Sequence, residues 1–180
     1  MPGGRVVEVG NEAPRGVAFQ RLADEHIGHA YRLANAILRN PSDAEDAVHD
    51  AFVTAWERWS SLRDEARFDA WFGRIVVNNC RDRLRRASRW GLTDISAEIG
   101  LSTPDATGGV QDREQVARAL SRLKPDDRLV LALRYYRDLR VEDIADLLGI
   151  PFGTATSRLR TAHIRLRAIL DEAGPEGTTR

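Results

Sequence analysis

Apolar residues recur at every third or fourth position along most of this chain, and that spacing constrains the fold more than any other feature. One stripe runs from Phe19 to Leu38, and others follow over 48–59, 68–84 and 116–170. Such spacing favours amphipathic helices, and no stretch alternates apolar and polar residues long enough to predict a strand. The sequence therefore predicts an all-α protein arranged in two small helical bundles.

Local signals predict where these helices begin and end. Asn40-Pro41 is expected to stop the first helix, because proline disfavours helical backbone in the residue before it. The sequence Ser42-Asp43-Ala44-Glu45 has the pattern of a capping box and is expected to open the second helix. The polar residues 60–67 are predicted to form a loop, and Pro125 suits the first turn of a later helix.

A change in composition divides the chain into two parts. Residues 90–112 lose the helical stripe and are rich in Gly, Ser, Thr and Asp, which is typical of a linker between domains. We predict five segments: a flexible tail (1–15), a first domain (16–90), a flexible acidic linker (91–112), a second domain (113–172) and a flexible tail (173–180).

Composition argues against several classes of protein. The formal net charge is zero, so a case for nucleic-acid binding has to come from how the charges are distributed. Cys80 is the only cysteine, which excludes a disulfide framework and argues against a cysteine-based zinc site. No apolar run approaches the roughly 20 residues of a membrane span. We expect a cytoplasmic protein with no membrane insertion, no metal site and no cofactor.

The string His26-Ile27-Gly28-His29 matches a nucleotide-binding signature of one class of aminoacyl-tRNA synthetases. That signature needs a preceding strand within a parallel sheet, whereas here it lies inside a continuous helical stripe. A metal site on the two histidines would need further ligands nearby. We interpret the string as a coincidence on a surface helix, and we predict no catalytic residue.

The strongest local pattern lies near the C-terminus and predicts a helix-turn-helix in the second bundle. A short amphipathic helix over 142–148 is followed by Gly149, which suits a helix C-cap, and then by a longer helix over 154–170. This second helix carries Arg158, Arg160, Arg165 and Arg167 and has no acid between 152 and 168. Such a helix can enter a major groove and hold phosphates. The alternative is an ordinary helical hairpin with a solvated basic face.

Two further segments carry charge of opposite sign. Five arginines stand against Asp82 alone over 81–89, and they become a candidate phosphate track once a second DNA-binding element is present. The start of the predicted second helix is acidic instead, with Asp43, Glu45, Asp46 and Asp50. Part of that acidity complements the helix dipole, but its position beside an aromatic stripe ending in Trp56 and Trp59 indicates a protein partner.

The order and spacing of these three segments resemble an extracytoplasmic-function sigma factor, a member of the smallest class of bacterial sigma factors. Residues 40–59 resemble the part that grips the clamp helices of RNA polymerase. Residues 67–86 resemble the part that melts and captures the −10 promoter element. Residues 119–170 resemble the −35-binding domain. The resemblance implies a promoter-specificity subunit that is not an enzyme and that has core RNA polymerase, promoter DNA and an anti-sigma factor as partners.

The resemblance also implies roles for individual residues. It implies that four residues contact polymerase: Asp43, Asp46, His49 and Asp50. Contact with the −10 element falls to the segment 62–67 and the third helix, through Arg63, Asp64, Asn78, Arg81, Arg85 and Arg86. Contact with the −35 element falls to the last helix, through Thr154, Thr156, Ser157, Arg158, Arg160 and Thr161. Trp71 matches a family tryptophan, but its place in the stripe favours packing in the core.

Several positions depart from the common pattern of the family. His49 departs from it in the polymerase-binding segment. Four positions of the last helix also depart from it, so the preferred −35 sequence is not predicted: Phe152, Thr156, Thr161 and Ile164. In the family context the acidic linker could thread a basic channel built for RNA, or it could be a plain tether. The alternative function is a stand-alone helix-turn-helix regulator with an N-terminal dimerisation or sensing bundle. An α-helical metalloenzyme would need repeated Glu-x-x-His pairs, which the sequence lacks.

Overall fold

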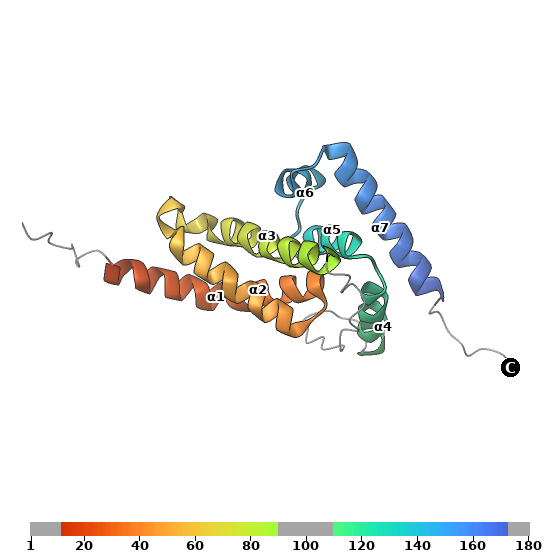
Figure 1. Ribbon diagram of the computed structural model, residues 1–180, viewed down its shortest axis with the longest axis horizontal. Coiled ribbons are helices and arrows are strands. Elements are labelled where there is room, and N and C mark those ends of the chain that lie inside the picture. The colour runs from red at the N-terminus through yellow and green to blue at the C-terminus, as the bar shows by residue number, and fades with distance from the viewer. Residues whose placement is uncertain (1–11, 90–109, 173–180) are drawn as a thin grey trace, which may run out of the picture.

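The computed structural model describes residues 12–89 and 110–172, and every regular element within these ranges is helical (Figure 1). The all-α prediction is therefore confirmed, as is the division into two helical units with a helix-turn-helix in the second. Most of the predicted linker, most of the predicted N-terminal tail and all of the predicted C-terminal tail lie outside the described residues. Within the described ranges, no helix is long and apolar enough to cross a membrane, and no cluster of side chains could hold a metal ion.

The N-terminal unit is a bundle of three helices: α1 (Glu12–Leu38), α2 (Pro41–Glu57) and α3 (Phe68–Arg89). The half-buried aromatic ring of Phe19 on α1 packs against the core of this unit. It makes edge-on contacts with the rings of Phe52, Trp56, Trp59 and Phe68, at centroid distances of 5.1–6.4 Å. Aromatic pairs of this kind add to the stabilisation from burial alone, so one residue of α1 holds α2 and α3 together.

Two predicted boundaries in this unit were wrong. Helix α1 begins at Glu12, inside the segment predicted to be a flexible tail (1–15), because an existing helix gains one hydrogen bond for each residue added. Helix α2 begins at Pro41 and is capped by Asn40, whose side-chain oxygen accepts a hydrogen bond from the Asp43 amide at 3.1 Å. Asparagine is a strong N-cap and proline suits the first helical position, so the predicted capping box at Ser42 is not used.

The connection from α2 to α3 has more structure than the predicted loop. It contains two short 3-10 turns, Trp59–Ser61 and Glu65–Arg67. The Asp64 side chain accepts a hydrogen bond from the Ala66 amide at 3.0 Å and so caps the second turn. This turn leads directly into α3, and it fixes the direction from which the chain enters that helix.

The C-terminal unit contains α4 (Val110–Ser121), α5 (Pro125–Tyr135), α6 (Val141–Leu148) and α7 (Phe152–Glu172). Helix α4 begins two residues before the predicted end of the linker, and α7 extends beyond its predicted stripe at both ends. Gly149 ends α6 with φ = 64°, in the left-handed region that glycine adopts without a steric cost. Ala145, Ala155 and Ala162 are buried, and their small side chains allow α6 and α7 to approach closely.

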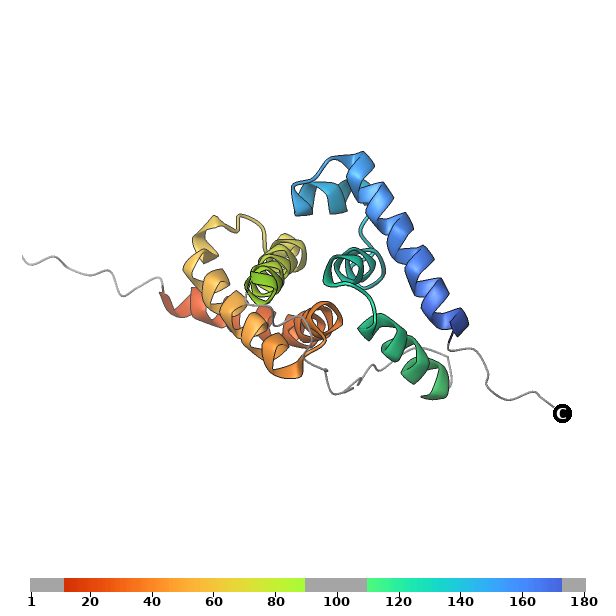
Figure 2. The ribbon, with the colours of Figure 1, turned by 45° about the vertical axis from the view of Figure 1, so that its right-hand side comes forward.

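The two units pack against each other, with α5 lying beside α1 (Figure 2). Their buried apolar residues form one continuous core. Two arginines at this boundary, Arg39 and Arg128, are almost completely buried. The sequence had suggested two separate bundles on a tether, and periodicity alone gives no sign that they touch.

Candidate polymerase and DNA interfaces

The three aspartates of α2 lie on one exposed face, and a single arginine from α3 reaches all of them. The Arg83 guanidinium donates to Asp50 at 2.6 Å and lies 3.6 Å from Asp46 and 4.0 Å from Asp43. The Arg83 side chain is 21% exposed, whereas the three carboxylates are 52–65% exposed. The carboxylates therefore keep much of their surface free for another partner while Arg83 holds their positions.

This contact corrects the sequence-based interpretation of Arg83. Arg83 had been counted in the basic run over 81–89, as part of a candidate phosphate track. Helix α3 instead turns Arg83 toward the aspartates of α2. His49, the fourth predicted polymerase-binding residue, is exposed on α2.

Most of the residues predicted to contact the −10 element are exposed, in the segment after α2 and on α3. Arg63, Asp64 and Asn78 all lie at the surface. The neighbouring Asn79 is different, because its side-chain amide donates to the Ala47 carbonyl at 3.3 Å and ties α3 to α2. Trp71 is half-buried and packs against the core beside Phe68, in agreement with the packing interpretation.

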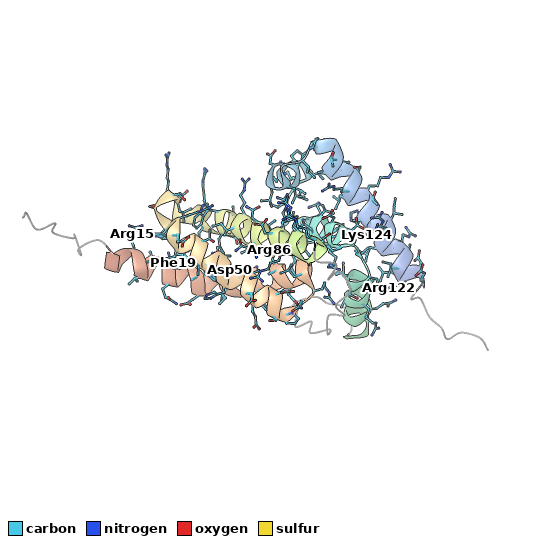
Figure 3. All side chains as sticks on the ribbon, viewed as in Figure 1. Arg15, Phe19, Asp50, Arg86, Arg122 and Lys124 are labelled. Atoms are coloured by element: carbon cyan, nitrogen blue, oxygen red, sulfur yellow. The ribbon has the colours of Figure 1, made fainter. Side chains whose placement is uncertain are left out.

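The arginines at the end of α3 differ in how far they are already engaged. Arg85 and Arg86 are exposed near the end of α3, where Figure 3 labels Arg86. Arg85 lies 3.7 Å from Asp82, and Arg86 has no ion pair among the described residues. Arg81 instead donates to the Leu148 carbonyl at the end of α6, at 3.1 Å. Burial and the positive charge of Arg85 lower the pKa of Arg81, against the opposing effect of two nearby aspartates. Arg81 is thus held by the C-terminal unit in this form of the protein.

The first turns of α7 present the side chains predicted to read the −35 element. Thr156, Ser157, Arg158 and Arg160 are exposed, while Thr154 and Thr161 are half-buried. The hydroxyls of Thr156 and Ser157 donate back to the carbonyls of their own helix, at 3.0 Å each. Their remaining capacity is that of acceptors, so the long side chains of Arg158 and Arg160 are the donors available for base edges or phosphates.

A basic cleft of about 1320 Å³ lies between the end of α3 and the helix-turn-helix. Three arginines of α3 line one wall: Arg81, Arg85 and Arg89. Helix α7 and the turn before α5 form the opposite wall, which includes Lys124, Arg158, Thr161 and Arg165. Part of the predicted −10 surface and part of the predicted −35 surface therefore face the same space.

Sequence reasoning missed the buried arginines between the two units. Arg128 donates to the carbonyls of Ile37, Ser121 and Leu123, and thereby caps the ends of both α1 and α4. Burial, with the nearby charge of Arg39, lowers the pKa of Arg128 to about 10. An unexpected arginine inside an apolar stripe was the only available signal, since the carbonyls it binds are invisible in sequence.

This fold, with an acidic face on the first unit, a basic helix end and a helix-turn-helix, defines a two-domain protein of the sigma-70 type. Residues 22–89 match sigma-70 region 2, and residues 119–168 match sigma-70 region 4. We refer to the two helical units by these names from here on. The match of both regions in this order leaves no support for the stand-alone regulator.

Relatives define the class more narrowly. The chain is 35% identical to the ECF RNA polymerase sigma factor SigM of Mycobacterium tuberculosis, over 85% of this chain and 77% of SigM. It is also 35% identical to SigL of the same organism, over 92% of this chain and 96% of SigL. Among solved structures, CnrH in complex with the cytosolic domain of CnrY is similar with a TM-score of 0.59 and 28% identity, covering 91% of each chain. The protein belongs to the extracytoplasmic-function (ECF) sigma factors, and it directs promoter recognition and the initiation of transcription.

Proposed function

We propose that the acidic face of α2 is the surface through which this sigma factor binds core RNA polymerase. The face consists of Asp43, Asp46, His49 and Asp50. The proposal is supported by the exposure of these side chains and by Arg83, which fixes three carboxylates on one side of the helix. Carboxylates held in place lose less side-chain entropy when they meet a basic partner, so the surface is prepared for binding.

The −10 element is bound, in this proposal, by the segment after α2 and by the exposed side of α3. Arg63, Asp64 and Asn78 would contact the opened strand, and Arg81, Arg85 and Arg86 would follow the backbone upstream. Support comes from the charge and exposure at the end of α3: Arg85 and Arg86 are exposed there, whereas Arg83 of the same run pairs with the acidic face of α2. These exposed arginines are the observation that carries the proposal.

The −35 element is bound by the start of α7, inserted into a major groove in the manner of helix-turn-helix proteins. Arg160 would read base edges, with Thr154, Thr156, Ser157 and Thr161 beside it, and Arg158 would hold phosphate. The support is the exposure of both arginines, together with the Gly149 turn that sets α7 across α6.

The protein acts in the cytoplasm beside RNA polymerase and performs no catalysis of its own, because the polymerase supplies the chemistry. We further propose an anti-sigma factor as its regulatory partner. The similar CnrH is found in complex with the cytosolic domain of CnrY, which supports a protein partner of this kind.

The polymerase surface is tested by a pull-down with core RNA polymerase. Asp46→Asn combined with Asp50→Asn should weaken core binding by about tenfold, since two charge-assisted contacts are removed. Glu57→Gln serves as the matched control, because Glu57 is exposed on the same helix and makes no contact with Arg83. Undiminished core binding by the double variant, with helicity intact, would assign the polymerase contact to another surface.

A further inference from the structure

We propose that region 2 carries a docking surface for region 4 of the same chain, closed by four arginines that we call the arginine latch. The latch consists of Arg39, Arg81, Arg128 and Arg137. It holds the free protein in a closed form that cannot engage the two promoter elements together. The inference rests on the proposed DNA-binding surfaces, but the docking itself can be measured without DNA or polymerase.

Arg137 makes the contact of the latch that is most accessible to experiment. Its guanidinium donates to the Asp69 carboxylate at 2.8 Å and to the Asp69 carbonyl at 3.1 Å, across the boundary between the two regions. His26 on α1 lies 3.3 Å from the same carboxylate. Burial raises the pKa of Asp69, but the hydrogen bond and charge of Arg137 outweigh this effect and leave that pKa below its usual value. Asp69 is therefore an anion at neutral pH, as the contact requires.

Gly73, one turn after Asp69 on α3, makes room for the Arg137 guanidinium. A Cβ atom at Gly73 would lie 2.9 Å from one Arg137 nitrogen and 3.0 Å from the central guanidinium carbon. The end of an arginine can usually move aside, but this one is tied to Asp69 by two hydrogen bonds. Gly73 is buried in the middle of a helix, where glycine is otherwise unfavourable. Accommodation of Arg137 supplies a reason for a glycine there.

The other three arginines donate across the boundary to backbone carbonyls. Arg128 reaches the Ile37 carbonyl at 3.2 Å, and Arg39 reaches the Ala117 carbonyl at 3.2 Å. Arg81 reaches the Leu148 carbonyl at 3.1 Å. The carbonyls of Ile37 and Leu148 lie at helix C-termini, where acceptors are unsatisfied and the helix dipole favours a cation. These hydrogen bonds therefore fix the position of region 4 on region 2.

The docked arrangement conflicts with simultaneous binding of both promoter elements. Elements centred at −10 and −35 lie about 25 base pairs apart, which is about 85 Å along straight B-form DNA at about 3.4 Å per base pair. Here Arg81 of the −10 surface touches the end of α6 in the helix-turn-helix, and both surfaces line the same cleft.

The distance between two spin labels on the free, full-length chain tests the docking. Ser60→Cys in region 2 and Glu142→Cys in region 4 introduce exposed labelling sites, whereas the native Cys80 is buried. We expect a single narrow distance distribution for this labelled parent. Gly73→Ala and Asp69→Arg should each shift it toward longer and broader distances, the first by displacing Arg137 and the second by opposing its charge.

Gly28→Ala is the matched control for the glycine substitution. Gly28 is exposed on α1, and a Cβ atom there would meet only Arg32 at 3.5 Å, an ordinary contact. It should leave the distance distribution unchanged. Circular dichroism should show that both alanine variants keep their helicity, because alanine favours a helix over glycine. A broad distribution in the parent, or a narrow and unchanged one in both Gly73→Ala and Asp69→Arg, would overturn the proposal.

The same variants separate failure of the latch from failure of the proposed function. Gly73 is not assigned to any polymerase or DNA contact, so Gly73→Ala should still support transcription with core polymerase. If the wild type does not direct transcription by core polymerase, the proposed function is wrong, and the distance measurements still test the latch. If Gly73→Ala and Asp69→Arg leave the distances unchanged while the wild type directs transcription normally, only the latch is wrong.

Discussion

Replacement of Arg83 by Met removes the only cation that contacts the acidic face of α2 among the described residues, while it keeps most of the aliphatic stem. Exposed ion pairs stabilise a protein by roughly 0.2–1 kcal/mol. The short contact with Asp50 should contribute a free energy near the upper end of this range, and the two longer contacts free energies near its lower end. The three carboxylates, spaced three and four residues apart, would then repel each other by about 0.2–0.5 kcal/mol per pair. We expect a loss of about 1–2 kcal/mol in the stability of region 2.

Urea unfolding followed by tryptophan fluorescence measures this loss selectively. All four tryptophans of the sequence lie between residues 56 and 90, so the signal reports on region 2 and not on region 4. With a urea slope of about 2 kcal/mol per molar, the midpoint should fall by roughly 0.5–1 M. Arg86→Met is the matched control, since Arg86 lies exposed on the same helix, and its midpoint should stay within about 0.3 M of the wild type.

Salt provides the second half of this test. The screening length is about 10 Å at 0.1 M salt and about 3 Å at 1 M, so an electrostatic loss should shrink by at least half at high salt. A midpoint for Arg83→Met that equals the control would mean that Arg83 does not organise the acidic face. A loss of the same size at both salt concentrations would assign the role of Arg83 to packing.

Three further predictions concern the core and the DNA surfaces. Burial raises the pKa of Cys80 to about 12, so the thiol of the folded protein should resist alkylation at pH 8. In urea the thiol should be alkylated at the rate at which the protein unfolds. Rapid alkylation without denaturant would contradict the burial of Cys80. Arg85→Ala with Arg86→Ala should reduce the slope of log promoter affinity against log salt by about 2, and an unchanged slope would show that neither contacts phosphate. Arg160→Ala should cost roughly 1–3 kcal/mol at its cognate base, and Thr156→Arg should change the −35 sequence selected from a randomised library; identical selections from both variants and the wild type would place base reading elsewhere.

The helices could be predicted because each carries its own apolar stripe, and the helix-turn-helix because Gly149 and the stripes beside it are local signals. The start of α2 was misjudged because two capping signals overlap, and the sequence does not say that Asn40-Pro41 outcompetes Ser42. The wrong grouping of Arg83 has a different cause. Which face of α3 turns toward α2 depends on the packing of the bundle, so a linear run of arginines was divided between two surfaces.

The boundary between the two regions was beyond sequence reasoning for a related reason. Arg128 and Arg39 bind backbone carbonyls, which every residue possesses and which therefore leave no trace in the choice of amino acid. Arg137 and Gly73 are 64 positions apart and become a pair only when the two regions dock. The charge of each individual surface could be predicted from the sequence, but the way in which the two regions face each other could not.

The central claim, that region 2 and region 4 together direct polymerase to promoters, is tested most directly by run-off transcription with core RNA polymerase on fragmented genomic DNA. The account predicts a small set of defined start sites that require this protein. Each should be preceded by shared −10 and −35 sequences, and the starts should weaken when Arg85 and Arg86 are replaced together or when Arg160 is replaced. Transcripts that arise without the protein, or start sites with no shared sequence upstream, would contradict the account.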